Sequence, residues 1–552
     1  MVKYRIIELL ERAAQEAQSK GLLPPESLPE VTVEHPQNPE HGDYASSLPL
    51  KLGRAARKNP LEVAQTLVGH LPPAEEVARA WAAPPGFVNI VLSDRWLAGQ
   101  VEAILEAGSS YGNTDLGRGS RVQIEFVSVN PTGPLHVGHG RGAILGSTLA
   151  NVLQAAGYRV EREYYVNDAG AQMDAFYRSL YARYCQALGK DIPMPPNGYV
   201  GDYLVDMARE LVAEAGDSPL TLPPEEGIRQ IGKRGLEKIM ASIRETLELL
   251  RVHFDVWFNE QSLYQKGQYE RAMSLLRQGG YTAEKEGAMW FVSTALGEDK
   301  DNVLVRSSGA PTYFASDVAY HYNKFLERQF DTVINIWGAD HQGHVSRMKA
   351  VVAALGIAPG RLKVIITQMV TLRRAEEVLR LSKRKGEVIT LRELVEEVGP
   401  DVCRFFFLAR SADSQMDFDL ALAKEQSADN PVYYVQYAHA RIASILRLAQ
   451  SKSIDYSDGD VSLLRAAPEL ALIRKMLTLP ELVELIAQSL EPHHLPYYAQ
   501  ELATLFHAFY RDCRVVSSDE ALTKARLKLV AATKAVLART LGLMGMTAPE
   551  QM

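Results

Sequence analysis

The segment from Arg121 to Val166 constrains the fold of this chain more than any other. Apolar residues alternate with polar ones over 121–126 as in a β-strand, and a loop rich in Gly and Pro follows at 131–140. An apolar helical pattern then runs to about Ala156, and a second strand pattern covers 159–166. Strand, helix and strand in this order predict an α/β domain built on a parallel, doubly wound sheet of Rossmann type.

The loop in this segment carries two histidines at the point where the helix is expected to begin. A helix N-terminus presents free backbone N–H groups and a positive dipole end, which suits a phosphate. His136 and His139 can donate hydrogen bonds to phosphate oxygens as charge builds during attack at phosphorus. Gly138 and Gly140 leave the backbone bare for a nucleotide to approach. The alternatives are a Gly-rich turn with surface histidines and a dinucleotide site, although the glycine spacing differs from GxGxxG.

Length and composition place this segment in a larger protein. A chain of 552 residues exceeds a single core, so two to four domains are expected. The net charge of -7 does not indicate a nucleic-acid binder, but a local basic groove in an acidic protein can hold RNA. Cys185, Cys403 and Cys513 form no zinc or disulfide spacing, which fits a reduced, cytoplasmic compartment without a protein-bound metal. No apolar stretch reaches the roughly 20 residues of a membrane span, so no membrane association is expected.

Changes in sequence pattern divide the chain into three expected domains. Residues 1–115 form a small α/β domain in this interpretation, residues 116–425 the Rossmann-type domain, and residues 426–552 an all-helical domain. A more helical and polar insertion interrupts the second domain at about 180–290. The sheet pattern resumes after it, at 331–337 and 362–367.

Two details of the first domain are predicted from local pattern. Residues 31–34, Val-Thr-Val-Glu, look like a strand. Asp43 precedes a helical stretch and is expected to cap it by accepting its free backbone N–H groups.

A basic loop forms the second candidate phosphate site. The run Leu381-Ser-Lys-Arg-Lys-Gly386 places three cations after the last sheet strand and before a helical region. Such a loop can clamp the β- and γ-phosphates of a nucleotide and the leaving pyrophosphate. A run of this kind is more often a solvated loop, and its position in the fold favours the phosphate role.

The histidine loop resembles a known signature. His136-Val-Gly-His139 is similar to the HIGH motif of class I aminoacyl-tRNA synthetases, with Val137 in place of the usual Ile. The longer segment from Glu125 to His139 resembles the version found in the arginyl-tRNA synthetase family. The basic loop resembles the KMSKS loop of class I enzymes, a motif that arginyl enzymes vary. Ser382 and Lys383 match it, whereas the other positions depart from it.

A third segment, Trp337 to His344, follows an apolar strand. Ligands bind at the carboxyl ends of strands in a doubly wound sheet. Gly338 allows an adenosine to approach, and Asp340 can accept hydrogen bonds from ribose hydroxyls. A strand-ending turn with a capping Asp is the alternative, and resemblance to the family's Gly-Ala-Asp-His segment favours the nucleotide.

The resemblance implies a role for each motif residue. The catalytic residues are expected to be His136, His139, Ser382 and Lys383. The ATP-binding residues are expected to be Pro134, His136, Gly138, His139, Gly338, Asp340, Lys383 and Lys385.

An arginine substrate requires carboxylates that can meet a planar guanidinium. Tyr313 and Asp317 lie four apart, hence on one face if their segment is helical, and by resemblance they hold the guanidinium. Glu260 is the second carboxylate by the same comparison. Glu125 and Asn130 would meet the α-ammonium and α-carboxylate groups. For any single acid here the alternative is a solvated surface charge.

Candidate tRNA contacts lie in the C-terminal domain. Tyr433, Tyr437 and Arg441 share an expected helix, and tyrosine rings can stack on unpaired bases. Packing of these rings in a helical core is an equally good interpretation. The domain resembles the family's anticodon-binding domain, and residues 1–115 resemble its additional tRNA-binding domain.

The resemblance covers nearly the whole chain and implies arginyl-tRNA synthesis in two steps. ATP and L-arginine would give arginyl-adenylate, and the arginyl group would pass to the 3′ end of tRNA(Arg). Magnesium would arrive with ATP, and a cytoplasmic monomer is expected. Two alternatives remain: another class I synthetase, cysteinyl or class I lysyl, and a catalytically silent tRNA-binding paralogue. The absence of a thiolate zinc spacing argues against the cysteinyl enzyme, and the signature histidines argue against the paralogue.

Overall fold

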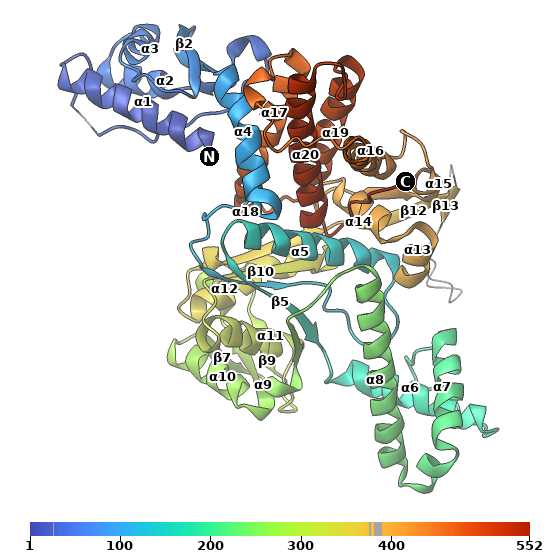
Figure 1. Ribbon diagram of the computed structural model, residues 1–552. Coiled ribbons are helices and arrows are strands. Elements are labelled where there is room, and N and C mark those ends of the chain that lie inside the picture. Colours follow the sequence, from blue (N-terminus) through green and yellow to red (C-terminus); the bar gives the residue numbers. More distant parts are fainter. Residues whose placement is uncertain (26, 375–376, 380–388) are drawn as a thin grey trace.

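The signature segment lies at the centre of a molecule with four parts (Figure 1). The computed structural model describes residues 1–25, 27–374, 377–379 and 389–552. An N-terminal α/β domain and a C-terminal helical bundle lie side by side above the central sheet in this view, and a helical arm projects below it. Among the described residues, no helix combines the length and apolar character that crossing a membrane requires.

The central domain is built on a five-stranded sheet whose strands all run parallel, in the order β11-β10-β4-β5-β6. The strands are β4 (Arg121–Glu125), β5 (Arg159–Val166), β6 (Val256–Asn259), β10 (Thr332–Gly338) and β11 (Leu362–Thr367). The chain leaves β4 toward β5 and β6, and later returns to the other side of β4 with β10 and β11. The order therefore reverses between β4 and β10, and the carboxyl ends of these two strands mark the expected ligand crevice.

The strand–helix–strand prediction for the signature segment is confirmed. Helix α5 (Val137–Ala155) connects β4 to β5 and is buried along most of its length, between the sheet and helices packed on its other side. Its outer neighbours include α13 (Leu391–Val398), α14 (Pro400–Leu408) and α18 (Leu479–Ser489).

Two glycines of α5 allow a prediction about this packing. A Cβ atom added at Gly146 would lie 2.3 Å from Cγ of the buried Phe126 ring, whereas one at Gly142 would meet nothing closer than Ile336 Cγ2 at 4.0 Å. Gly146→Ala should lower the free energy of unfolding by about 1–3 kcal/mol through overpacking. Gly142→Ala is the matched control, with a gain of up to about 1 kcal/mol from helix propensity. Thermal unfolding of both variants tests the pair, and equal midpoints would contradict it.

The helical arm consists of α6 (Ala171–Ala187), α7 (Asp202–Ala215) and α8 (Pro224–Leu249). It corresponds to the start of the expected insertion, but the predicted bounds of about 180–290 are wrong in two respects. The arm already begins at Ala171, and β6 falls inside that range although it is the edge strand of the central sheet. A strand of only four residues between helical stretches gives little periodic signal, which explains the difference.

A smaller subdomain completes the central region. A three-stranded antiparallel sheet is formed by β7 (Thr282–Lys285), β8 (Ala288–Phe291) and β9 (Asn302–Val305). The helices around it are α9 (Gln261–Gln265), α10 (Gln268–Gln278), α11 (Tyr313–Tyr322), the π-helix η5 (Asn323–Glu327), the 3-10 helix η6 (Ala339–His344) and α12 (Val345–Ala354). Helix α11 and η5 form one continuous path, so the segment predicted to be helical around Tyr313 and Asp317 is confirmed as such.

The N-terminal domain pairs a three-stranded antiparallel sheet with helices. Its elements are α1 (Val2–Ser19), β1 (Tyr44–Ser46), α2 (Leu48–Ala56), α3 (Pro60–Gly69), β2 (Val77–Ala83), β3 (Phe87–Leu92) and α4 (Asp94–Ala107). The strand predicted at 31–34 is wrong, since this stretch makes only an isolated bridge from Glu34 to Ala45. The capping role of Asp43 is also wrong. Its carboxylate accepts from the Leu92 N–H at 2.7 Å and from Arg474 Nε at 2.7 Å, so it links β3 to the C-terminal bundle.

The helical prediction for the C-terminal domain is confirmed. The bundle contains α16 (Pro431–Ser451), α17 (Ala467–Leu477), α18, α19 (His494–Asp512) and α20 (Glu520–Leu543). A connecting unit precedes it, with β12 (Val370–Arg374), β13 (Glu377–Leu379), β14 (Met416–Asp419) and α15 (Leu420–Lys424) beside α13 and α14.

The end of α20 is tied to the signature helix. Asn151 Nδ2 on α5 donates to the Leu543 carbonyl at 3.1 Å. The fully buried Arg404 of α14 donates to Ser147 Oγ on α5 at 2.9 Å and to the carbonyl of Met544. The bundle thus contacts α5 through polar bonds along the half that lies far from the signature histidines.

Candidate active site

A pocket of about 590 Å³ opens at the carboxyl ends of the central strands, at the point where the strand order reverses. Its walls come from β4 and the loop after it, from β5, from β10 with η6, and from α11. The predicted site residues that line it are Glu125, Asn130, His139, Glu260, Tyr313, Asp317, Gly338 and Asp340. Segments separated by up to 215 positions in the sequence therefore meet in one cavity, as a two-substrate site requires.

The two signature histidines form a reciprocal cap at the start of α5. His136 Nδ1 accepts from the Gly138 N–H at 3.1 Å, and His139 Nδ1 accepts from the His136 N–H at 3.1 Å. The ring centroids are 3.5 Å apart. Since each Nδ1 is an acceptor, a neutral ring carries its proton on Nε2. Both histidines are thereby held as Nε2–H donors by the backbone of the helix that they begin.

The electrostatic state of His139 follows from its burial. Desolvation, with a smaller contribution from His136, lowers the pKa of His139 to about 3. The ring is therefore neutral near pH 7 and acts as a hydrogen-bond donor without a charge. Of the four motif residues in this loop, only His139 lines the pocket, and Pro134, His136 and Gly138 are not among its lining residues.

Three carboxylates, those of Asp317, Glu125 and Glu260, form the wall of the pocket opposite His139. Burial, together with the neighbouring Glu125 and Glu260, raises the pKa of Asp317 to about 7, against the opposing effect of nearby cations. Burial also raises the pKa of Glu260, while hydrogen bonds from Ser316 and Tyr165 lower it. Ionisation of Asp317 is therefore disfavoured until a cation enters. The wall is suited to a ligand that carries more than one positive group.

Tyr313 and Asn130 lie at the edges of this wall. The Tyr313 side chain begins α11 one turn before Asp317 and is 45% exposed, so its ring can cover a ligand from the solvent side. Asn130 Nδ2 donates to Gln172 Oε1 at 2.6 Å, which ties the loop after β4 to the helical arm. Tyr203 of α7 strengthens this tie with a 2.5 Å bond to the Thr132 carbonyl.

At the end of β10, the backbone passes close to an acidic side chain. A Cβ atom added at Gly338 would lie 2.6 Å from Asp340 Oδ1, the movable end of an exposed side chain that can turn aside. Asp340 is exposed at the pocket mouth, and its carboxylate lies 3.5 Å from His341 Nε2. These positions place both residues where a ligand on the open side of the pocket would pass.

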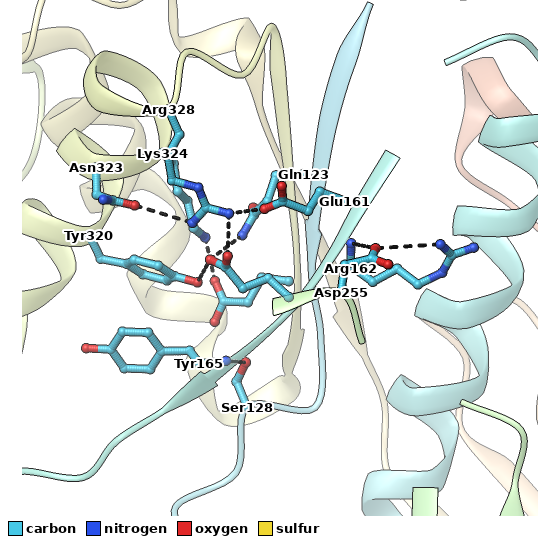
Figure 2. A network of polar contacts seen from close by, with 12 residues as sticks. Gln123, Ser128, Glu161, Arg162, Tyr165, Asp255, Tyr320, Asn323, Lys324 and Arg328 are labelled. Atoms are coloured by element: carbon cyan, nitrogen blue, oxygen red, sulfur yellow. Dashed lines mark hydrogen bonds and ion pairs between the residues drawn. The ribbon is translucent and has the colours of Figure 1, made fainter. Parts of the chain in front are cut away.

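A buried polar network underlies the pocket and was not predicted from the sequence. Figure 2 shows Arg328 and Tyr320 directed toward strands β4 and β5. Tyr320 Oη donates to Glu163 Oε1 at 2.5 Å, and Arg328 Nη2 lies 2.5 Å from Glu163 Oε2 and also contacts Glu161. One signal was available: Glu161 and Glu163 alternate on β5 and so share a face, while Lys324 and Arg328 are four apart. Charged side chains of this kind are usually solvated, so the sequence pattern alone did not indicate a buried network.

Three predicted residues of the basic loop, Ser382, Lys383 and Lys385, lie outside the described residues. Within the described ranges, no group of three or more His, Cys, Asp or Glu side chains is arranged to hold a metal ion.

The predicted tRNA contacts share one face of α16, beside α19. The rings of Tyr433 and Tyr437 stack at 5.9 Å with an interplanar angle of 8°. Arg441 Nη2 donates to Tyr437 Oη at 2.9 Å, and its guanidinium lies over the Tyr437 and Tyr510 rings at 4.8 and 4.9 Å. All three predicted residues are half-buried, whereas Val435 takes the fully buried face.

Comparison with known proteins identifies the class of this fold and site. Residues 100–404 match the family model described as tRNA synthetases class I (R), catalytic domain. Residues 4–92 match the Arginyl tRNA synthetase N terminal domain, and residues 435–552 match the DALR anticodon binding domain. The central domain is thus the catalytic domain of a class I aminoacyl-tRNA synthetase.

Whole-chain relatives narrow the class. The arginine–tRNA ligase of Dehalococcoides mccartyi is 59% identical over 551 residues, covering 100% of this chain and 99% of that protein. That of Carboxydothermus hydrogenoformans is 49% identical, covering 98% and 97%. The Thermus thermophilus arginyl-tRNA synthetase structure has a TM-score of 0.78 at 24% identity, over 100% of both chains, and supports the fold. The chain belongs to the arginyl-tRNA synthetase family.

This membership decides between the alternatives raised by the sequence. The chain is a ligase and not a cysteinyl or lysyl enzyme or a silent paralogue, and tRNA, ATP and arginine are its substrates.

Proposed function

We propose that the pocket at the ends of β4 and β10 activates L-arginine. The arginine carboxylate attacks the α-phosphorus of ATP, which gives arginyl-adenylate and releases pyrophosphate. The terminal adenosine of tRNA(Arg) then takes the arginyl group through its 2′-hydroxyl and releases AMP. The observation that carries this proposal is that one cavity joins a neutral histidine donor at a helix N-terminus to three clustered carboxylates.

The nucleotide is assigned to the side of α5 and β10. We infer that the Nε2–H groups of His136 and His139 stabilise charge on the α-phosphate in the transition state. Pro134 and Gly138 lie along the phosphates, and Gly338 and Asp340 meet the adenosine. Ser382, Lys383 and Lys385 contact the pyrophosphate, and Mg²⁺ arrives with ATP.

The amino acid is assigned to the carboxylate wall. Asp317 and Tyr313 hold the guanidinium, and Glu260 supplies a second carboxylate. Glu125 and Asn130 meet the α-ammonium and α-carboxylate. This assignment is supported by the arrangement of the acids, since the ligand brings two cationic groups to a wall that holds three carboxylates.

The chain is proposed to work as a cytoplasmic monomer with three functional units. Residues 1–115 are assigned to additional tRNA contacts, residues 116–425 to catalysis and residues 426–552 to the anticodon. ATP–pyrophosphate exchange, measured with each amino acid and with or without tRNA(Arg), tests the activity directly. We expect exchange with arginine alone among the amino acids, and only when tRNA(Arg) is present. No arginine-dependent exchange in the presence of cognate tRNA would overturn the proposal.

The anticodon assignment leads to a prediction for α16. Tyr433, Tyr437 and Arg441 are proposed to contact tRNA, with the tyrosine rings stacked on unpaired bases. Tyr433→Leu should raise the KM for tRNA by about 5- to 100-fold, because stacking contributes about 1–3 kcal/mol per base. Tyr433→Phe keeps the ring and should behave like the unmodified enzyme. Aminoacylation with varied tRNA measures both, and equal KM values for the two variants would remove Tyr433 from the interface.

A further inference from the structure

A buried lysine lies behind the amino-acid pocket. Lys324 is 0% exposed and belongs to η5, the π-helix that continues α11. Its ammonium nitrogen lies 2.6 Å from Glu125 Oε2 and 3.0 Å from Asn335 Oδ1. It is also 4.0 Å from the centroid of the Tyr320 ring. Since Glu125 ends β4 and Asn335 lies on β10, the charge sits between the two strands at which the sheet order reverses.

The position of this charge is not explained by the packing of the core. Removing an ammonium group from water is unfavourable, and an apolar residue of similar volume often stabilises a protein as well or better. A π-helical turn is rare and is found mostly at functional sites. Here the turn carries Lys324 from the end of α11 into the sheet, where it meets a carboxylate of the pocket wall.

Arg328, four residues later, provides a contrast. It is paired with Glu161 and Glu163, and neither of these acids is among the residues that line the pocket (Figure 2). Figure 2 also shows Lys324 of η5 beside Arg328, the residue that follows η5, with both side chains directed toward the strands. Two cations, the fully buried Lys324 in η5 and the partly exposed Arg328 at its C-cap, therefore lie close together, and Lys324 is the one that contacts an acid of the substrate wall.

We propose that Lys324 is a positioning residue for amino-acid binding, which holds the Glu125 carboxylate from behind so that it can receive the α-ammonium group of the substrate. The inference rests on the role proposed for Glu125 and extends it to a residue that does not touch the substrate. Lys324 supplies the counter-charge in the empty pocket, and the ammonium of the ligand adds a second cation when it binds.

The surrounding charges indicate what removal of Lys324 would do. Three side chains from the sheet face Lys324: Glu125 of β4, Glu163 of β5 and Asn335 of β10. His321 of α11 and Arg328, which follows η5, face it from its own helical segment. His321 is neutral, because burial lowers its pKa to about 3. Asp317 is faced by Glu125, Glu260, Arg347 and Lys324, of which the last two lower its pKa. Loss of Lys324 would therefore move the pKa of Asp317 upward from about 7.

Two arginine analogues separate a role in ammonium binding from a general effect on the fold. Agmatine keeps the ammonium and guanidinium groups and lacks the carboxylate, whereas 5-guanidinopentanoate lacks the ammonium. Lys324→Met should raise the Ki of agmatine about 10- to 100-fold, the range for a charge-assisted hydrogen bond. The Ki of 5-guanidinopentanoate should change by less than about threefold at pH 8.5, where Asp317 stays largely ionised. The acid limb of kcat/KM for arginine should also move to higher pH.

Arg328→Met is the matched control, since it removes a neighbouring, partly buried cation at the end of η5 whose acidic partners do not line the pocket. It should leave the ratio of the two Ki values and the acid limb unchanged, whatever it does to stability. If Lys324→Met weakens both analogues equally and leaves the acid limb in place, Lys324 is structural only and the inference is overturned.

Glu125→Gln and the double variant Glu125→Gln with Lys324→Met complete the test. We expect Glu125→Gln to weaken agmatine selectively, and the double variant to have the same Ki ratio as Glu125→Gln. The double variant buries no unpaired charge, so it remains informative if Lys324→Met does not fold. If Glu125→Gln leaves agmatine binding unchanged, the role proposed for Glu125 fails. If Glu125→Gln weakens agmatine binding selectively, but the double variant binds agmatine a further tenfold more weakly, Lys324 does not act through Glu125.

Discussion

Replacing His136 with asparagine should slow arginine-dependent ATP–pyrophosphate exchange by about 100- to 1000-fold, the usual cost of one transition-state hydrogen-bond donor. The imidazole has one function in the structure and one in the proposal. Its Nδ1 accepts the Gly138 N–H at the start of α5, and its Nε2–H is proposed to be the donor to phosphate. Asparagine is a good N-cap residue and preserves the first function, while it cannot place a donor where Nε2 lies. The expected loss is in kcat, with a smaller change in the KM for ATP.

The control for this prediction is the N-cap of another helix. Ser93 caps α4 by accepting the Trp96 N–H, far from the pocket. Ser93→Asn should therefore leave the exchange rate unchanged. An exchange rate of His136→Asn within about threefold of the unmodified enzyme would show that the ring contributes only a cap.

Replacing Asp317 with asparagine should raise the KM for arginine by about 100-fold or more, because a buried guanidinium loses its ionic partner. The KM for ATP should change by less than about threefold, since the nucleotide lies on the other side of the pocket. Asp174→Asn, on the exposed face of α6, is a control that should alter neither constant. Equal increases in both KM values would remove Asp317 from the guanidinium site.

The same carboxylate gives arginine binding a pH dependence. With a pKa of about 7, Asp317 must lose a proton before it can pair with a guanidinium, so kcat/KM for arginine should rise with pH and level off above about 7. The raised pKa also means that Asp317 contributes stability to the free enzyme below its ordinary value of 3.8, and that this contribution is lost as the pH rises through about 7. Bound arginine should therefore increase the thermal midpoint more at pH 8 than at pH 6. The acid limb should disappear in Asp317→Asn.

The parts of the fold that could be predicted from the sequence are those with a strong local period. The alternation over 121–126, the apolar helix to about Ala156 and the strand at 159–166 are confirmed in β4, α5 and β5. The four-residue strand β6 could not be found, because its position at the sheet edge depends on pairing with β5. Asp43 was assigned to a helix that follows it closely, whereas its partners are 49 and 431 residues away.

The candidate site divides in a similar way. Residues carried by short motifs, such as His139 and Asp340, come together in the pocket with acids from β4, α9 and α11. Lys324 and Arg328 were missed, because a charged residue in a helical stretch is ordinarily solvated. The full burial of Lys324 and the partial burial of Arg328 depend on the assembled sheet, since acids on β4 and β5 supply the opposite charges. The sequence around Lys324 and Arg328 does not reveal these partners, because they belong to distant segments of the chain.

The hydrogen bonds between α5 and the end of α20 hold one half of the signature helix, and the histidines lie at the opposite end of that helix. Nineteen residues of α-helix span roughly 28 Å, and the bundle contacts the half that lies opposite His136. Asn151 lies roughly 22 Å along the helix from His136, so a tilt of one degree at that contact displaces the histidine end by roughly 0.4 Å, close to the roughly 0.5 Å tolerance of a catalytic group. The position of the signature histidines at the pocket therefore depends in part on the hydrogen bonds that Asn151, Ser147 and Arg404 make at the other half of the helix.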